Sequence, residues 1–252
     1  MCGLVGFFSK ANHDTNIIRN MLHKIRHRGP DSFGIWADLE CNIHFGHVRL
    51  SIVELSSAGH QPMSTSCGRF TIIFNGEIYN HLDIRRELGN NIKWSGTSDT
   101  ETLLKSISTW GISSTLKKMV GMFSFALWDS VERSLYLARD RMGEKPLYYG
   151  WCNGSFIFGS ELKALKSHPD FDAEIDWQAI NGYLHNNYIS SPLTIYSKLK
   201  QLRPGHYIKM SYDDLLSGNI PVLYKYWALS FPVSDNNCRY VDSVSELETL
   251  LT

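Results

Sequence analysis

The residues Cys2-Gly3-Leu4-Val5-Gly6-Phe7-Phe8 directly follow the first methionine of the chain. Gly3 to Phe8 is a short apolar run with glycines where neighbouring backbones can approach closely, which is typical of a buried strand. Cys2 stands at the start of this strand. If Met1 is removed, Cys2 carries a thiol and a free α-amino group on one carbon, which together form a nucleophile with its own base. The alternative is a small apolar residue that fills space at the start of a strand.

Charge is balanced along the chain. The 252 residues include 25 Lys and Arg and 25 Asp and Glu, and no segment is strongly one-sided. Nucleic acid and anionic membrane surfaces are therefore not expected as main partners. No apolar run approaches the roughly 18–20 residues of a membrane span, and the N-terminus lacks the basic-then-apolar pattern of a signal peptide. The length allows one large domain, or one domain and part of another.

Cysteine and histidine usage argues against disulfides and metals. The five cysteines are far apart and odd in number, which favours reduced thiols and a cytoplasmic location. His23 and His27 have the i, i+4 spacing of a helical metal pair, but Lys24 stands where a zinc protease would have its glutamate. We therefore expect two exposed histidines on a basic helix and no metal site.

The spacing of apolar residues predicts both helices and strands. Helices are expected from Asp14 or Thr15 to about residue 26 and over 81–88, 99–109 and 113–119, with two short helices opening near 160 and 176. Strands are expected over 3–8, 33–37, 43–51, 70–74, 123–128, 135–138, 147–152, 155–158 and 206–210. Asn153-Gly154 is a strong signal for a tight hairpin. Antiparallel hairpins with helices grouped elsewhere favour an α+β fold over a doubly wound sheet.

The C-terminal end differs in character from the rest. Residues 211–240 form an irregular stretch that is rich in aromatic side chains. After it comes a helix with an apolar stripe, formed by Val241, Val244, Leu247, Leu250 and Leu251. Such a stripe with no following partner suggests that a second domain has been cut away or is supplied by another chain.

Two short segments offer polar groups at the ends of predicted strands, where they can face a cleft. Arg49, which precedes Leu50-Ser51-Ile52-Val53, can hold a carboxylate by two parallel hydrogen bonds; the alternative is a surface arginine in an ion pair. Asn75 and Gly76 follow the strand expected to end at residue 74. The Asn75 amide and the Gly76 N–H would form an oxyanion hole, and the alternative is a simple Asn-Gly turn.

Two further segments surround predicted turns. Ser98 or Asp99 can cap the helix that follows, which is the default interpretation, or a carboxylate there can receive a substrate ammonium group. Residues 26–31 form a clear turn without an evident chemistry. An arginine, carboxylates, a thiol and two oxyanion donors form a set that fits glutamine, whose side-chain amide would meet the thiol. The set is suggestive but not unique.

At this point the order and spacing of the segments indicate a family. The chain resembles the glutaminase domain of the glutamine-hydrolysing asparagine synthetases, which are class II glutamine amidotransferases of the N-terminal-nucleophile type. The resemblance covers residues 2 to about 210 and rests on Met-Cys-Gly at 1–3, Arg-His-Arg-Gly-Pro-Asp at 26–31, Arg-Leu-Ser-Ile-Val at 49–53, Asn-Gly-Glu-Ile-Tyr-Asn at 75–80, Ser-Asp-Thr-Glu at 98–101, Gly-Met-Phe-Ser-Phe-Ala at 121–126 and Arg-Asp-Arg-Met-Gly-Glu-Lys-Pro-Leu-Tyr-Tyr at 139–149. It implies a four-layer α/β/β/α sandwich of two antiparallel sheets, in agreement with the α+β pattern.

The resemblance also implies a role for each motif residue. Cys2 is expected to be the nucleophile, with its own α-amine as general base, and Asn75 and Gly76 to form the oxyanion hole. Arg49 is similar to the arginine that binds the glutamine α-carboxylate. Glu77 and Asp99 resemble the partners of the ammonium group. The backbone of Leu50, Ser51, Ile52 and Val53 is expected to line the pocket.

The same resemblance implies a domain plan. Residues 2–210 are expected to form the glutaminase domain, 211–240 a linker, and 241–252 the start of a synthetase domain. The Ser-Gly-Gly-x-Asp-Ser loop that binds ATP in this family does not occur. We therefore expect no cofactor for this chain, ATP and Mg²⁺ only for the missing domain, and L-glutamine and a synthetase domain, in cis or in trans, as partners. A fragment of a longer protein is favoured over a stand-alone glutaminase.

Other functions stay open from the sequence. The ammonia acceptor can be aspartate or another carboxylate, such as a sugar acid of a surface polysaccharide. A non-catalytic domain that senses glutamine would keep the same fold, although several intact residues argue against it, namely Cys2, Arg49, Asn75, Gly76 and Asp99. An N-terminal-nucleophile hydrolase that acts on a different amide is a further alternative. The sequence does not indicate an oligomeric state.

Overall fold

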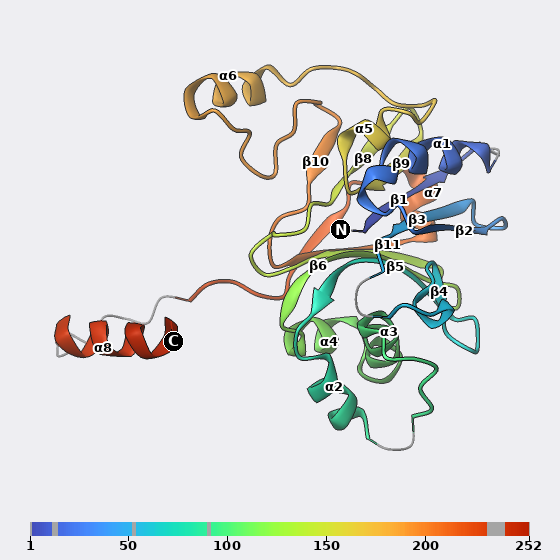
Figure 1. Ribbon diagram of the computed structural model, residues 1–252. Coiled ribbons are helices and arrows are strands. Elements are labelled where there is room, and N and C mark those ends of the chain that lie inside the picture. The colour runs from blue at the N-terminus through green and yellow to red at the C-terminus, as the bar shows by residue number, and fades with distance from the viewer. Residues whose placement is uncertain (1, 12–14, 52–53, 90–91, 231–239, 252) are drawn as a thin grey trace.

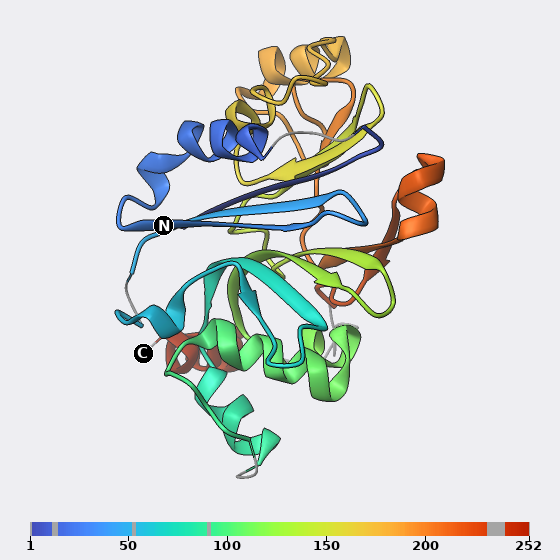
Figure 2. The same ribbon diagram turned by 90° about the vertical axis from the view of Figure 1, so that its right-hand side faces the viewer.

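Two six-stranded antiparallel sheets lie face to face in the computed structural model (Figures 1 and 2). The structure describes residues 2–11, 15–51, 54–89, 92–230 and 240–251. Strand order is β10-β8-β9-β1-β3-β2 in the first sheet and β12-β11-β7-β6-β5-β4 in the second. Helices α1 and α5 cover the outer face of the first sheet, and α2, α3 and α4 cover that of the second. This is the four-layer α+β sandwich expected from the sequence.

The strands are β1 (Gly3–Ser9), β2 (Ser32–Asp38), β3 (Ile43–Arg49), β4 (Met63–Ser64), β5 (Phe70–Ile78), β6 (Gly121–Asp129), β7 (Ser134–Arg139), β8 (Tyr148–Cys152), β9 (Ser155–Gly159), β10 (Leu199–Gln201), β11 (His206–Ser211) and β12 (Val222–Lys225). The α-helices are α1 (Asn16–Lys24), α2 (His81–Leu88), α3 (Asp99–Trp110), α4 (Ile112–Lys118), α5 (Leu162–Leu165), α6 (Trp177–Asn186), α7 (Tyr212–Ser217) and α8 (Tyr240–Leu251). Short 3₁₀ helices are η1 (Arg26–Arg28) and η2 (Ser57–Gly59).

The opening strand is buried on both faces, which explains its continuous apolar run. Leu4 and Phe8 belong to the core between the two sheets. Val5 and Phe7 belong to the core between the first sheet and the helices α1 and α5. At Gly6 an added Cβ would lie 2.3 Å from the Phe158 ring, so the neighbouring strand comes too close for any side chain. Packing on both sides therefore fixes β1 in the centre of its sheet.

The Asn153-Gly154 hairpin is confirmed. Both residues have positive φ values, of 45° and 91°. A two-residue hairpin turn whose twist matches that of its flanking strands requires positive φ at both of its residues. The turn joins β8 to β9 in register.

Strand β5 runs further than the sequence predicts. We expected the strand to end at Phe74, but it continues to Ile78. Asn75 pairs with Ser124 of β6, and Gly76 pairs with Phe123. Cross-strand pairing therefore overrides the weak strand propensity of Asn and Gly, and the alternative of a simple Asn-Gly turn is wrong.

The C-terminal segment also differs from the expectation of an irregular stretch from residue 211. Helix α7 buries Leu215 against the core between the sheets. Strand β12 pairs with β11 and becomes the edge of the second sheet. Buried Tyr226 donates a hydrogen bond from its hydroxyl to the Arg139 carbonyl at 2.8 Å. The folded body therefore extends beyond residue 210, to about Trp227. Helix α8 has no buried residue.

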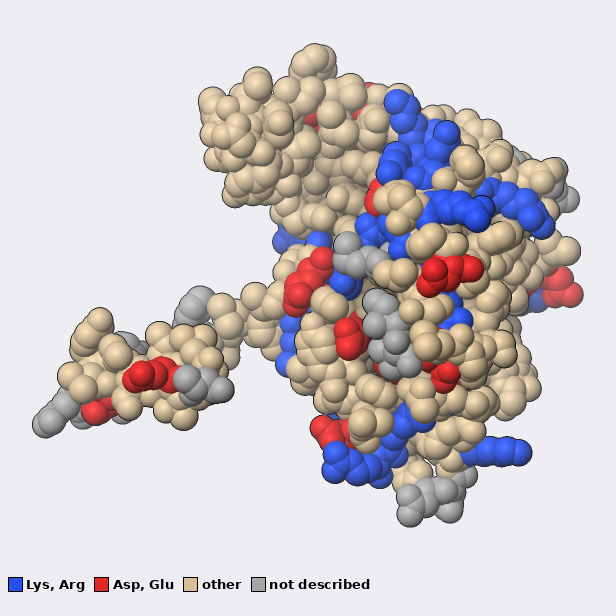
Figure 3. Space-filling model, viewed as in Figure 1, with Lys and Arg blue, Asp and Glu red and all other residues tan. Residues whose placement is uncertain are grey.

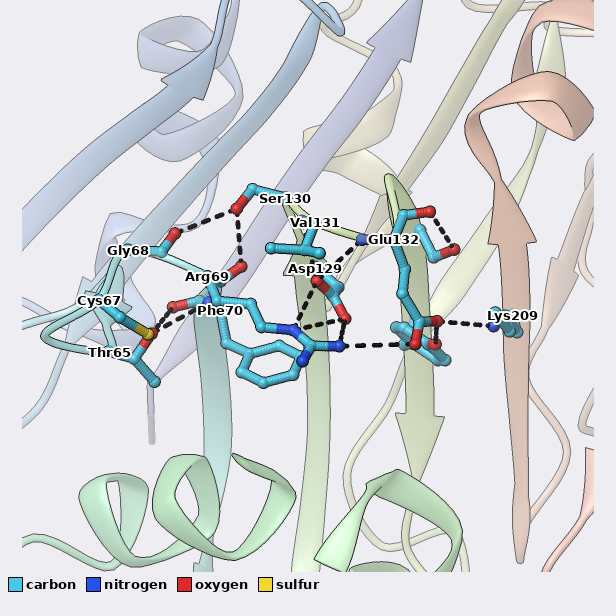
Figure 4. Close-up of polar contacts among 12 residues, drawn as sticks. Thr65, Cys67, Gly68, Arg69, Phe70, Asp129, Ser130, Val131, Glu132 and Lys209 are labelled. Carbon is cyan, nitrogen blue, oxygen red and sulfur yellow. Dashed lines mark hydrogen bonds and ion pairs between the residues drawn. The ribbon is translucent and has the colours of Figure 1, made fainter. Parts of the chain in front are cut away.

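Ion pairs join strand ends of the second sheet (Figure 4). Arg69 donates to both carboxylate oxygens of Asp129 at the end of β6, with a shortest distance of 2.8 Å. Lys209 of β11 pairs with Glu132 at 3.0 Å. This network connects strands and includes none of the predicted site residues. Among the described residues, no helix is long and apolar enough to cross a membrane.

Candidate active site

One cavity brings together most of the residues that the sequence singled out. It is lined by Cys2, Arg49, Leu50, Ser51, Asn75, Gly76, Glu77 and Asp99. Ile52 and Val53 lie outside the described residues. Ser98, which the sequence offered as a helix cap, also lines it, and the sequence did not single out the rest of the lining, which is Glu54, Gly59, Gln61, Phe74, Thr100, Met122 and Lys145. The lining comes from both sheets, so the cavity exists only because the sheets pack on each other.

The Cys2 thiol lies against the backbone of Leu50. The Leu50 N–H donates to Cys2 Sγ at 3.3 Å, and the thiol donates to the Leu50 carbonyl at 3.6 Å. Burial raises the pKa of the Cys2 thiol, and the hydrogen bond with Leu50 acts in the opposite direction. The thiol is therefore held in its neutral form and needs a base to become a nucleophile.

Asn75 and Gly76 present the features of an oxyanion site. Asn75 is 1% exposed, and its buried Nδ2 has no hydrogen-bond partner among the described residues. A buried amide donor without a protein partner is left to bond a ligand or a water. A Cβ at Gly76 would lie 2.3 Å from the Met122 carbonyl, so only glycine fits against β6. Both residues line the cavity that holds the thiol.

Arg49 is buried and held by a loop. Its guanidinium donates to the Ser56 carbonyl at 3.0 Å and to the Glu54 carbonyl. No ion pair of Arg49 is found among the described residues, so the surface ion pair considered from the sequence is not what the structure shows. The guanidinium instead lies at the wall of the cavity.

Ser98 and Asp99 have separate positions at the start of α3. Ser98 is the cap, because its side chain accepts a hydrogen bond from the Thr100 N–H. Asp99 follows it, is 7% exposed, and accepts a hydrogen bond from the Ile78 N–H at 3.0 Å. Burial raises the pKa of Asp99. Because Ser98 caps the helix, the Asp99 carboxylate is available to the cavity.

Two acidic groups differ in their surroundings. Glu77 is exposed at the cavity rim. Glu54 accepts hydrogen bonds from the N–H and hydroxyl of Thr97, both at 2.9 Å. Hydrogen bonds from Ser56 and Thr97 lower the pKa of Glu54 to about 2. The Glu54 carboxylate therefore connects two segments. One is the loop whose backbone carbonyls accept hydrogen bonds from Arg49, and the other is the segment before α3.

The turn at residues 26–31 acquires a chemistry that its sequence did not reveal. Arg28 donates from Nε to the Cys2 carbonyl at 2.9 Å and from Nη1 to Glu161 at 2.9 Å. Asp31 accepts a hydrogen bond from the Ser51 N–H at 2.8 Å. A Cβ at Gly29 would lie 2.4 Å from the Arg49 nitrogen. The turn therefore positions Cys2 and the end of β3 without lining the cavity itself.

Lys145 reaches the cavity through a loop built on Asp140. Fully buried Asp140 accepts hydrogen bonds from four backbone N–H groups, those of Phe123, Met142, Glu144 and Lys145. Lys145 itself is 6% exposed. Arg139 and Asp140, at the end of β7, thus support the loop that places the cationic side chain of Lys145 in the cavity wall.

His47 connects the strands that carry Arg49 and Asn75. Its Nε2 donates to the Phe74 carbonyl at 3.0 Å across the two sheets. Burial lowers the pKa of His47 to about 3, so the imidazole is neutral at physiological pH. This bond fixes the spacing between the two walls of the cavity.

Within the described parts of the chain, no group of three or more His, Cys, Asp or Glu side chains is arranged to hold a metal ion. The Nε2 atom of His27 lies 3.0 Å from the Oε1 atom of Glu161.

Comparisons with known proteins show the family of the chain. A family model described as a glutamine amidotransferase domain matches residues 1–227. The chain is 36% identical over 234 residues to asparagine synthetase (glutamine-hydrolyzing) 3 of Bacillus subtilis, covering 90% of the chain and 36% of that protein. It is 33% identical over 273 residues to a putative asparagine synthetase (glutamine-hydrolyzing) of Mycobacterium tuberculosis, covering 98% of the chain and 41% of that protein. The chain thus spans about two fifths or less of these relatives.

A solved structure shares the fold. Glutamine phosphoribosylpyrophosphate amidotransferase from B. subtilis, complexed with ADP and GMP, superposes with a TM-score of 0.63 at 19% identity. The match covers 90% of this chain and 49% of that one.

Proposed function

The chain belongs to the family of glutamine amidotransferase domains, and we propose that its Cys2 thiol hydrolyses L-glutamine to glutamate and ammonia. The proposal rests on one observation above the others. Cys2 and Asn75 line the same cavity, and the buried Asn75 Nδ2 has no hydrogen-bond partner among the described residues. A nucleophile and an oxyanion donor in one cavity are the minimum requirement for acyl transfer.

The proposed chemistry proceeds in two halves. After removal of Met1, the α-amine of Cys2 accepts the thiol proton through a water, and the thiolate attacks the side-chain amide carbon of glutamine. Asn75 and Gly76 donate to the oxygen that becomes negative. The tetrahedral adduct collapses, its nitrogen takes the proton from the α-ammonium, and ammonia leaves. Water then attacks the γ-glutamyl thioester and gives up a proton to the departing Cys2 sulfur, which releases glutamate and regenerates the thiol.

Substrate recognition uses the opposite charges of the cavity wall. The Arg49 guanidinium is assigned to the α-carboxylate of glutamine, because it lies in the cavity wall and is the type of group that can donate two parallel hydrogen bonds to a carboxylate. Asp99 and Glu77 are assigned to the α-ammonium group. The backbone from Leu50 to Val53 is assigned to the pocket lining, and Leu50 already contacts the thiol.

The use of the ammonia is a separate part of the proposal. The relatives named above are glutamine-hydrolyzing asparagine synthetases, and they are longer than this chain. We infer that the ammonia passes to a synthetase domain in cis or in trans, in the cytoplasm, and that ATP and Mg²⁺ serve that domain. The glutaminase half-reaction itself requires no metal or organic cofactor.

Glutamate release from glutamine tests the proposal. Wild-type protein whose intact mass shows the loss of Met1 is expected to release glutamate and ammonia in equal amounts, and Cys2→Ala is expected to release neither. Glutamine binding by both proteins without turnover in the wild type would indicate a sensing domain and overturn the proposal. Turnover of another amide in place of glutamine would overturn the substrate assignment.

A further inference from the structure

A second cavity lies on the outer side of the first sheet, between α1, η1 and the segment that leads into β2. Its volume is about 390 Å³, and it shares no lining residue with the candidate active site. A cavity needs only about 10–15 Å³ to hold one water molecule. The cavity therefore has room for an organic molecule.

Two arginines and a histidine stand in the wall of this cavity. Arg19 and His23 come from successive turns of α1, and Arg26 comes from η1. Within the described part of the chain, none of these three side chains forms an ion pair. The single carboxylate in the lining is Asp31, which already accepts a hydrogen bond from Ser51. Figure 3 shows Lys and Arg gathered on this side of the molecule, over α1 and α5.

The floor of the cavity is apolar with one polar exception. Leu22 and Val48 are buried beneath it, and Phe33 is 50% exposed at its edge. Ser32 also lines the cavity, and its hydroxyl oxygen is buried without a hydrogen-bond partner among the described residues. A buried hydroxyl without a partner costs free energy unless a ligand or water satisfies it.

We propose that this cavity binds a small organic anion. Its phosphate or carboxylate group pairs with Arg19 and Arg26, whose planar guanidinium groups suit both anions. Its apolar body lies on Leu22, Val48 and Phe33, and the Ser32 hydroxyl donates to one of its oxygens. The proposal does not rest on glutamine hydrolysis, because it concerns a different cavity.

Phenyl phosphate and benzoate are suitable probes, because each joins an anionic group to an apolar ring. Binding is followed by calorimetry and by the methyl NMR signals of Leu22 and Val48. The test variant is Arg19→Ala/Arg26→Ala, in which both changed side chains are exposed, so folding is expected to be retained. The matched control is Lys24→Ala, an exposed cation of the same helix that does not line the cavity.

The wild type is expected to bind phenyl phosphate, benzoate or both, with shifts of the Leu22 and Val48 methyl signals. The dissociation constant is expected to rise at least about tenfold in the double variant and to stay unchanged in Lys24→Ala. A preference between the probes identifies the anionic group. Absence of binding by both probes at millimolar concentrations would overturn the proposal. Equal binding by the double variant, or equal weakening by Lys24→Ala, would overturn it too.

Discussion

Asn75 keeps a buried amide donor that has no partner among the described residues. Leaving such a group unsatisfied costs about 1–3 kcal/mol of folding stability. Proteins tolerate this kind of cost at functional positions, where a substrate or transition state supplies the missing acceptor. The unsatisfied donor is thus a local conflict that the proposed oxyanion role explains.

Asn75→Ala is expected to lower kcat for glutamine hydrolysis about 10²–10³-fold, because one oxyanion donor is lost. KM is expected to change little, since the donor acts mainly on the charge that develops during attack. Steady-state kinetics checks this. The control is Ser124→Ala, which removes a buried hydroxyl directly opposite Asn75 on β6. Equal loss of activity in both variants would mean that general packing, and not the amide donor, is responsible.

Asp99 combines a functional gain with a stability cost. Burial raises its pKa, so the folded chain holds this proton at a pH where the unfolded chain has already lost it. Folding stability therefore falls as the pH rises from the ordinary aspartate range through the raised pKa of Asp99, and the loss persists at neutral pH. Asp99→Asn removes the charge and retains an oxygen that can accept from the Ile78 N–H.

Asp99→Asn is expected to raise the Tm at neutral pH, with a difference from the wild type that shrinks as the pH falls below the ordinary aspartate range. It is also expected to raise KM for glutamine about 10–100-fold, because a charged hydrogen-bond partner of the ammonium group is lost. Thermal melts across pH and steady-state kinetics measure both effects. An unchanged KM would remove Asp99 from the substrate site.

At the scale of elements, the turn at 26–31 supports the end of β3. Pro30 forms a bridge with Arg49, and the Asp31 N–H donates to the Arg49 carbonyl at 3.1 Å. Gly29 lies so close to β3 that an added Cβ would fall 2.4 Å from backbone atoms of Val48 and Arg49. The turn can therefore move only if Arg49 moves with it.

Gly29→Ala is expected to destabilise the fold by about 1–3 kcal/mol through overpacking. It is also expected to weaken glutamine binding, because the backbone of Arg49 is displaced. Chemical denaturation and KM check the two effects. The matched control is Gly182→Ala in α6, where an added Cβ has no neighbour within 4 Å. That change is expected to be neutral or to stabilise by up to about 1 kcal/mol through helix propensity. A Gly29→Ala variant that behaves like the control would show that the turn does not position Arg49.

At the scale of the whole molecule, much of the fold can be predicted from local patterns in the sequence. The Asn153-Gly154 turn, the Ser98 cap and the buried run of β1 each depend on neighbouring residues and were readable from sequence. The end of β5 was not readable, because Asn75 and Gly76 are poor strand formers that only β6 holds in place.

The candidate site also has residues that the sequence indicates and residues that it does not. Cys2, Arg49, Asn75 and Asp99 were found from motifs whose order matches a family, and the structure brings them into one cavity. The residues that support them are far away in sequence. Arg28 reaches Cys2 from 26 positions away, and Glu54 reaches Thr97 from 43. Such contacts follow from the packing of the sheets and leave no local pattern.

The extent of the folded body gives a prediction at this scale. Ending the chain after Trp227 is expected to leave the Tm within a few degrees, because no residue of α8 is buried. Ending it after Ser211 removes buried Leu215 and Tyr226 and the hydrogen bond to Arg139. The loss is expected to be about 5 kcal/mol, a fall in Tm of about 10–20 °C. Calorimetry of both truncated chains measures this difference. Equal stability of the two chains would contradict a folded body that extends to about Trp227.

The cysteines offer an internal contrast for testing the role of Cys2. Cys41 and Cys152 are buried, whereas Cys67 is exposed. Hydrogen bonding with Thr65 lowers the pKa of Cys67 (Figure 4). A simple alkylating reagent is therefore expected to modify Cys67 in preference to Cys2, whose thiol has a raised pKa. Selective modification of Cys2 requires recognition of glutamine.

Peptide mapping after treatment with an electrophilic glutamine analogue tests the central claim most directly. The proposed function predicts a single adduct on Cys2, its suppression by excess glutamine, and its absence in Cys2→Ala, with iodoacetamide reacting first at Cys67. An adduct that forms on Cys67 as readily as on Cys2, or a Cys2 adduct that glutamine does not suppress, would contradict the assignment of Cys2 as the glutamine nucleophile.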